Sequence, residues 1–336
     1  MPNVEAIIVR AFAGHGPVAG EDPPIAESMI DQMSAQVRGQ QLVAAPARSL
    51  RAVLSDYVSL TKPRVMSLLL LTELLAMVTA ARGWPGWGLT VFALVGGALA
   101  SGGASAINCW FDRDIDAVMG RTRNRPLPAG RIGAGRAVAF GIGLTVAAFL
   151  DFALLVNPLA AVLSLAGGAF YVFVYTFWLK RSTKENIVIG GAAGAMPPLV
   201  GWAAVTHGVA PVGLALFALV FLWTPPHFWA LSIIIRRDYQ AVSVPMRPVV
   251  VGVRRTKTGI LAYTLVMVAA SCALAIWLGP FELLVALVLG IPFVVLAGKV
   301  LMEERGMRWA RRLFQFSMIY LFAFFLGTAL VASLAR

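Results

Sequence analysis

The sequence predicts an all-α integral membrane protein, a bundle of nine transmembrane helices, and three observations carry this prediction. Of the 336 residues, 59% are hydrophobic and only 13% are charged, whereas about a quarter of the residues in a soluble domain are charged. Nine segments reach the roughly 20 mostly apolar residues that a membrane-spanning helix requires. Between these segments Lys and Arg gather in alternate loops, which is typical of chains that cross a bilayer repeatedly.

The first four predicted spans are apolar runs that cover residues 65–82, 88–111, 136–156 and 159–179. The loop after the second span carries six Lys and Arg residues between Arg113 and Arg136, and the loop after the fourth carries three. Several glycines lie in the second span, among them Gly102 and Gly103. Small residues let helices approach closely where lipid gives no hydrophobic drive for association, so we expect a close helix pair there.

The last five predicted spans cover residues 187–206, 211–235, 259–278, 281–302 and 313–334. The loop after the sixth span carries six Lys and Arg residues, and the loop after the eighth carries five. The fifth and sixth spans contain proline pairs at 197–198 and 225–226, which remove backbone donors from a helix.

The positive charge indicates topology before it indicates a partner. The amino-terminal segment and the four charged loops hold 26 of the 28 Lys and Arg residues, and the opposite side has only Arg82 and Arg336. Because cations concentrate on the cytoplasmic side of membrane proteins, we expect a multi-pass protein of the cell inner membrane with its amino terminus in the cytoplasm and its carboxy terminus in the periplasm. The net charge of +12 therefore does not call for a nucleic acid.

Residues 1–50 contain no sustained apolar run and include five acids between Glu5 and Asp31. We expect a poorly ordered cytoplasmic extension here, neither a cleaved signal peptide nor an organelle transit peptide, followed by a membrane domain over residues 51–336. The two cysteines, Cys109 and Cys272, give no disulfide framework and no metal-site spacing.

A candidate metal site lies at the end of the second span. Asn108, Asp112 and Asp116 are spaced by four, so on a helix successive side chains sit about 40° apart around the axis and roughly 6 Å apart along it. Two carboxylates and an amide oxygen on one face can hold magnesium and leave positions for phosphate oxygens. The alternative is a solvated helix end whose acids pair with Arg113 and Arg121.

The loop that follows is rich in arginine, with four between Arg121 and Arg131, and it contains Pro126 and Pro128. Guanidinium groups bind phosphate oxygens in a bidentate manner, so acids and arginines side by side suit a magnesium diphosphate. Alone, such a loop is more often positive-inside charge than a ligand site. Its position directly after the acids favours the ligand site.

The segment Asn108–Arg131 resembles the first aspartate-rich motif and following loop of the UbiA-type intramembrane prenyltransferases, and in detail it resembles their haem O synthase branch. The resemblance runs from about residue 56 to the carboxy terminus. Other matching segments are Leu60–Arg64, Asn186–Trp202, Trp223–Leu231, Asp238–Tyr239 and Pro245–Met246. The superfamily commonly has a second motif with two or more acids after the sixth span, but this chain has only Asp238 there, which puts a second magnesium site in doubt.

The resemblance implies that a farnesyl group passes from farnesyl diphosphate to a vinyl group of haem b, with magnesium assisting loss of diphosphate, to give haem O. It also implies a downstream haem-modifying or terminal-oxidase assembly partner. The metal ligands would be Asp112, Asp116 and Asn108. The residues expected to contact the substrates or assist the reaction are Arg121, Arg125, Lys180, Lys62, Arg64, Arg181, Tyr175, Asn186, Asp238 and Tyr239. For Lys180 and Arg181 an ordinary pair of cations at a helix end is the alternative.

His227 is the only histidine within a predicted span, directly after the proline pair at 225–226. A neutral imidazole could ligate haem iron or transfer a proton. Alternatively, it bonds to carbonyls freed by the two prolines.

Three other functions are compatible with parts of the sequence. A related prenyltransferase could act on an aromatic or quinone-precursor acceptor, but His227 and its surrounding motif count against this. A transporter would place ionisable groups and broken helices near the middle of the bilayer, whereas these acids lie at a helix end and Glu73 is the clearest acid well inside a span. A haem-insertion factor would not need three aligned metal-binding groups beside four arginines.

Overall fold

The computed structural model describes residues 49–335, nearly all of which belong to one compact unit, Arg51–Arg336. Residues 1–48 of the predicted extension lie outside the described residues. Within the described part the chain is helical and has no strand, which confirms the predicted fold class.

Nine helices in the described part are long and apolar enough to cross a membrane, as the hydrophobic runs predict. In two of them a change between α-helix and π-helix divides the span, and in a third the α-helix is interrupted at Leu274. The nine are α4 (Pro63–Ala81), α5 (Trp87–Phe111), α7 with η1 (Ala134–Asp151, Phe152–Val156), α8 with η2 and α9 (Pro158–Ala169, Phe170–Leu179, Lys180–Ser182), α10 (Asn186–Thr206), α11 (Pro211–Ile234), α14 with α15 (Val253–Ala273, Ala275–Leu278), α16 (Pro280–Met302) and α17 (Arg308–Leu334).

The helices extend beyond the apolar runs at the charged end of the bundle. The seventh span begins at Val253, six residues before the predicted start at 259, and the ninth begins at Arg308. A hydrophobic run marks the part of a helix suited to lipid, whereas backbone hydrogen bonding sets where the helix begins. The helices α10 and α11 also continue through their proline pairs, so the two donors lost at each pair do not divide these helices. Broken helices, the feature that favoured a transporter, are therefore not found in these two spans.

Glycine contacts bring α5 and α7 together, as the small residues of the second span predict. A Cβ added at Gly103 would lie 2.7 Å from the carbonyl oxygen of Gly141, and one added at Gly141 would lie 3.0 Å from the carbonyl oxygen of Gly103. These distances are below van der Waals contact, so only glycine permits the two backbones to meet here. The largest core cluster instead joins α10, α11, α14, α16 and α17 around buried aromatic residues that include Trp229, Phe293 and Tyr320.

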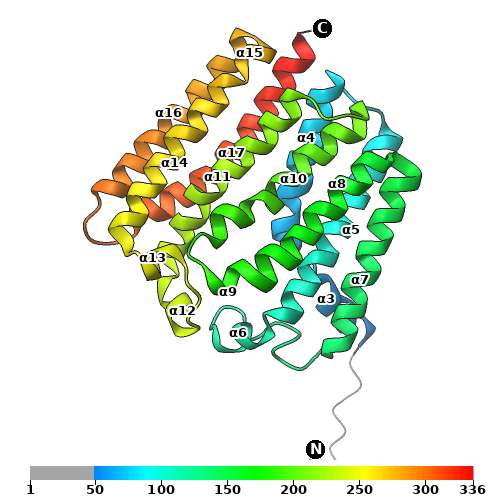
Figure 1. The fold of residues 1–336 in the computed structure, drawn as a ribbon, viewed down its shortest axis with the longest axis vertical. Coiled ribbons are helices and arrows are strands. Elements are labelled where there is room, and N and C mark those ends of the chain that lie inside the picture. Colours follow the sequence, from blue (N-terminus) through cyan, green and yellow to red (C-terminus); the bar gives the residue numbers. More distant parts are fainter. Residues whose placement is uncertain (1–48, 336) are drawn as a thin grey trace, which may run out of the picture. The chain divides into compact units, whose positions relative to one another are not determined.

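The short helices other than α15 lie at one end of the bundle (Figure 1), and this end carries the candidate site. They are α6 (Arg113–Val118), α9, α12 (Arg236–Ala241) and α13 (Arg247–Val250), while α3 (Leu50–Leu60) precedes the first span at the same end. The spans that end here and those that begin here place their terminal polar side chains next to one another, away from the apolar middle of the helices.

Candidate active site

The acid motif lies where α5 ends and α6 begins. Asn108, Asp112 and Asp116 are buried, with at most 5% of each residue exposed. The backbone N–H of Asp112 donates to the Asn108 carbonyl at 2.9 Å, and that of Asp116 donates to the Asp112 carbonyl at 2.8 Å. The spacing of four therefore keeps its helical hydrogen bonds across the junction. Asn108 Nδ2 also donates to Asp112 Oδ2 at 2.8 Å, which joins the first two side chains directly.

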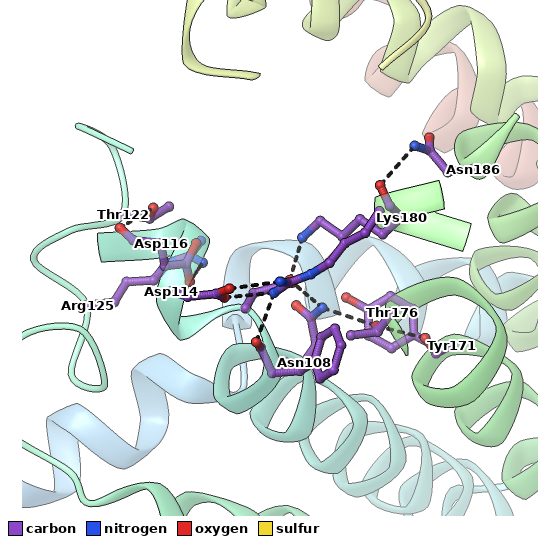
Figure 2. A network of polar contacts seen from close by, with 12 residues as sticks. Asn108, Asp114, Asp116, Thr122, Arg125, Tyr171, Thr176, Lys180 and Asn186 are labelled. Atoms are coloured by element: carbon purple, nitrogen blue, oxygen red, sulfur yellow. Dashed lines mark hydrogen bonds and ion pairs between the residues drawn. The ribbon is translucent and has the colours of Figure 1, made fainter. Parts of the chain in front are cut away.

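Cations from distant parts of the sequence surround these side chains (Figure 2). Lys180 at the start of α9 forms an ion pair with Asp112, and Arg125 pairs with Asp116 at 2.7 Å. Lys62, between α3 and α4, donates to Asn108 Oδ1 at 2.6 Å. Six predicted substrate or metal residues thus meet in one network. Within the described residues the acids do not pair with the exposed Arg113 and Arg121, as the solvated-helix alternative requires.

Arg181 links α9 to the acid motif through a second carboxylate. Its guanidinium donates to Asp114 at 2.7 and 2.8 Å, lies 3.7 Å from Asp112 Oδ1, and stacks 4.7 Å from the centre of the Phe111 ring. The hydrogen bond from Arg181 lowers the pKa of Asp114 to about 2, because it stabilises the charged form. The helical spacing places Asp114 off the metal-binding face. Asp114 instead holds Arg181 next to Asp112 on that face.

The helix that supplies Lys180 is wound more loosely than an α-helix. In η2 the backbone N–H of Lys180 donates to the carbonyl of Tyr175, five residues earlier, and Thr176 Oγ1 donates to the carbonyl of Tyr171, also five residues earlier, at 2.8 Å. Backbone hydrogen bonding to the fifth residue back, as from Lys180 to Tyr175, defines a π-helix, which is rare and often marks a functional site. The wider turn allows Tyr171, Thr176 and Lys180 to lie along one side of the helix, facing Asn108 (Figure 2).

Thr176 is a member of the site that the sequence did not reveal. It is fully buried, and its hydroxyl oxygen accepts from Asn108 Nδ2 at 3.1 Å. A hydroxyl has one hydrogen, and here it is donated to Tyr171. Both hydrogens of the Asn108 amide are therefore directed at Thr176 and Asp112, which leaves Asn108 Oδ1 as the atom facing Lys62. No sequence signal identifies Thr176, because a π-helical register cannot be read from hydrophobic spacing.

The remaining predicted residues lie around the network at varying distances. Asn186, at the start of α10, is fully buried and donates to the Lys180 carbonyl at 3.4 Å. Tyr175 stacks on Tyr171 with ring centres 5.5 Å apart. Asn186 therefore lies next to Lys180, and Tyr175 lies next to Tyr171.

Asp238 and Tyr239 lie on α12, and Arg121 approaches them from the arginine-rich loop. Burial raises the pKa of Tyr239, and the charge of Arg121 partly opposes that rise. Arg64 is exposed on the first turn of α4, and within the described residues no side-chain contact joins it to the network. Its predicted role stays untested.

His227 lies on α11, and its side chain faces α17. Its ring is stacked between Trp223 and Phe314, with ring centres 4.2 and 4.7 Å away, and its Nδ1 lies 2.6 Å from Ser317 Oγ. Ser317 Oγ donates its hydrogen to the Phe314 carbonyl at 2.7 Å. The hydrogen in the contact between His227 and Ser317 must therefore lie on His227 Nδ1, which donates to Ser317 Oγ. In a neutral imidazole, Nε2 then keeps its lone pair. The ring is therefore held by a hydrogen bond to Ser317. It is not held by backbone carbonyls freed by the proline pair, as the alternative interpretation requires.

The donor set at the α5–α6 junction fits a small divalent cation. Asp112 Oδ1 is buried and has no hydrogen-bond partner among the described residues, since the Arg181 guanidinium stays 3.7 Å away; such an atom is costly unless a ligand satisfies it. Among residues 49–335 there is no group of three or more His, Cys, Asp or Glu side chains suited to a metal. A cation held here therefore depends on two carboxylates and the Asn108 amide, an oxygen-only set that suits magnesium completed by water or phosphate oxygens.

Comparison with known proteins identifies close relatives. Residues 69–322 match the model of the UbiA prenyltransferase family. The chain is 53% identical over 283 residues to a protein of Symbiobacterium thermophilum named protoheme IX farnesyltransferase, covering 83% of this chain and 94% of that one. It is 49% identical over 280 residues to a protein of the same name from Roseiflexus sp., where the match spans 83% of this chain but about half, 52%, of the relative.

Two solved structures share the fold at low sequence identity. A structure of digeranylgeranylglyceryl phosphate synthase superposes with a TM-score of 0.70 at 17% identity, over 83% of this chain and 98% of that chain. A UbiA homologue from Archaeoglobus fulgidus, bound to DMAPP and Mg²⁺, superposes with a TM-score of 0.57 at 14% identity, over 81% and 99%. At these identities the likeness concerns the fold.

Proposed function

The chain belongs to the UbiA prenyltransferase family, and from that premise we propose that it transfers a farnesyl group from farnesyl diphosphate to a vinyl group of haem b, giving haem O. Prenyl transfer is supported by the network in which Asp112, Asp116 and Asn108 meet cations from three other segments. Haem b as the acceptor is supported by the 53% identity to a protoheme IX farnesyltransferase over most of both chains.

The network suits loss of a diphosphate leaving group. Asp112 and Asp116 would hold magnesium with help from Asn108, and the metal would supply neutralisation of the charge that develops on the leaving group. Lys180, Arg125, Lys62 and Arg181 already lie beside these oxygens, and Arg121 is exposed at the rim. Preplaced cations stabilise the departing diphosphate without reorganising during the reaction. Asp238 and Tyr239 stand on α12 as further candidates to orient Arg121.

His227 is proposed to face the haem acceptor. Stacking against Trp223 and Phe314 fixes the ring, and the hydrogen bond to Ser317 directs the hydrogen to Nδ1. The remaining lone pair on Nε2 can ligate iron or take a proton from the water that adds to the alkylated vinyl group. Both roles need the neutral form of the ring.

The site end of the bundle is proposed to face the cytoplasm of a cell with an inner membrane, because the four charged loops lie at this end. In this orientation the amino terminus is cytoplasmic and the carboxy terminus periplasmic. The lipid-embedded haem O product would pass to a haem-modifying or terminal-oxidase assembly enzyme.

A product assay tests the proposal. Purified protein in detergent is incubated with haem b, farnesyl diphosphate and magnesium, and the haem is read by mass spectrometry. A mass gain of one farnesyl group plus one water, abolished by chelating the metal, is expected. Prenylation of an aromatic acid in place of haem would favour the alternative acceptor, since the metal network serves either. No transfer to any acceptor by folded protein would refute the proposal.

A further inference from the structure

Several cations surround one tryptophan where α16 ends and α17 begins. Lys299 Nζ lies 4.5 Å from the centre of the Trp309 ring, and the guanidinium carbons of Arg312 and Arg308 lie 4.7 and 5.6 Å from it. We call Lys299, Arg308, Arg311 and Arg312 the basic cluster; it surrounds Trp309. Cations are attracted to the face of an indole ring, so Trp309 gathers like charges that would otherwise repel one another.

The arginines of the basic cluster share one face of α17. Arg308, Arg311 and Arg312 are followed by Gln315, a spacing of three and four that aligns side chains on a helix. With Met307 these four residues line a hollow of about 490 Å³. All three arginines are exposed, so a ligand can reach the hollow.

No side chain of the basic cluster forms an ion pair with an acid among the described residues. The neighbouring Glu303 instead caps the start of α17, where its carboxylate accepts from the backbone N–H groups of Arg308 at 3.0 Å and Trp309 at 3.3 Å. The side chains of the basic cluster have neither an ion pair nor a hydrogen bond to any residue between 49 and 335. By contrast, Arg125, Arg181 and Lys180 at the same end are each paired with an aspartate.

We propose that the basic cluster binds the phosphate of an anionic phospholipid headgroup. Guanidinium groups match phosphate oxygens in geometry and charge, and basic residues beside a membrane-spanning helix are attracted to anionic lipids. The same face of α17 continues with Met318, Ile319 and Phe322, which are 39%, 59% and 42% exposed. An apolar stripe directly beyond the cations gives acyl chains a surface to follow, which a free phosphate would not use.

Native mass spectrometry of the full-length protein tests this proposal with phosphatidylglycerol and phosphatidylcholine offered at equal concentration. The double variant Arg308→Gln/Arg312→Gln removes two cations beside Trp309. The matched control, Arg136→Gln/Arg254→Gln, removes the same charge from exposed sites at the starts of α7 and α14. Since one hydrogen bond from a charged group to phosphate changes binding by about tenfold or more, the double variant is expected to bind phosphatidylglycerol at least about thirtyfold more weakly. The arginines of the control do not line the hollow, so they make no direct contact with a phosphate held there, and the control is expected to change binding less than about twofold.

Trp309→Leu keeps every charge and serves as a second variant if the double variant does not fold. It is expected to reduce phosphatidylglycerol binding by about threefold, on the scale of one exposed cation–π contact. Equal losses in the double variant and the control would mean that general positive charge attracts the lipid, and would overturn the proposal. Unchanged lipid selectivity in the double variant and in Trp309→Leu would also overturn it, and would favour an acidic protein segment, such as one within residues 1–50, as the partner.

Discussion

Replacing Thr176 with valine removes one hydroxyl from the network around Asn108 while keeping the shape of the side chain. Asn108 Nδ2 then loses its 3.1 Å contact to Thr176 but keeps the 2.8 Å contact to Asp112, and Asn108 Oδ1 keeps the contact from Lys62. One of three hydrogen bonds that orient the amide is lost, so the expected penalty is that of a single buried hydrogen bond, about 1 kcal/mol. That corresponds to about a fivefold change in an equilibrium or rate constant.

The effect of Thr176→Val is expected in metal and diphosphate binding, because Thr176 acts through Asn108 and does not contact the acceptor. In the product assay, the magnesium concentration for half-maximal rate and the KM for farnesyl diphosphate should rise about fivefold, with the KM for haem nearly unchanged. Thr176→Ser keeps the hydroxyl and should restore wild-type values. If valine and serine variants both matched the wild type in magnesium dependence, the inferred orientation of Asn108 would be wrong.

Three further changes probe other parts of the site. Asp112→Asn should lower turnover at least about a hundredfold while leaving haem association, followed by absorption spectroscopy, largely intact; normal turnover would remove Asp112 from the metal set. His227→Ala should raise the KM for haem more than that for farnesyl diphosphate, and unchanged values for both would reduce His227 to a packing residue between Trp223 and Phe314. The pKa of Asp114 is lowered from 3.8 to about 2, so its pairing with Arg181 stabilises the fold above about pH 4 and this contribution is lost as the pH falls toward 2. Melting temperatures between pH 5 and pH 2 should therefore converge for the wild type and Asp114→Asn, and a constant difference would contradict the assignment.

The fold could be predicted because the hydrophobic runs are themselves its physical cause. Each of the nine runs lies in a helix long enough to span a bilayer, and the glycines of the second span include the one that meets Gly141. The helix starts were less accurate, since Val253 and Arg308 begin helices within charged segments. Hydropathy does not report where hydrogen bonding begins.

The site could be predicted only in part. Contacts between residues close in the sequence could be predicted, whereas contacts between distant segments could not. Asn108, Asp112 and Asp116 lie one helical turn apart, so their proximity follows from the sequence. Lys180 was expected from the resemblance, but its ion pair with Asp112 joins segments 68 residues apart. Thr176 could not be found, because its role depends on the π-helical register of η2.

The charges of the network indicate what kind of ligand it is suited to bind. Asp112, Asp114 and Asp116 stand against Lys62, Arg125, Lys180 and Arg181, so three carboxylates and four cations leave a formal charge of +1. A bare dication would meet repulsion from the four cations, and a bare diphosphate with about three negative charges would meet repulsion from the three acids. A diphosphate carrying one magnesium has a charge of about −1 and matches the network. The same residues can then serve in two pairings, because acids that turn toward a metal release Lys180 and Arg125 for phosphate oxygens. The ion pairs thus hold the buried Asp112 and Asp116 beside their cations, ready for a ligand that brings both signs together.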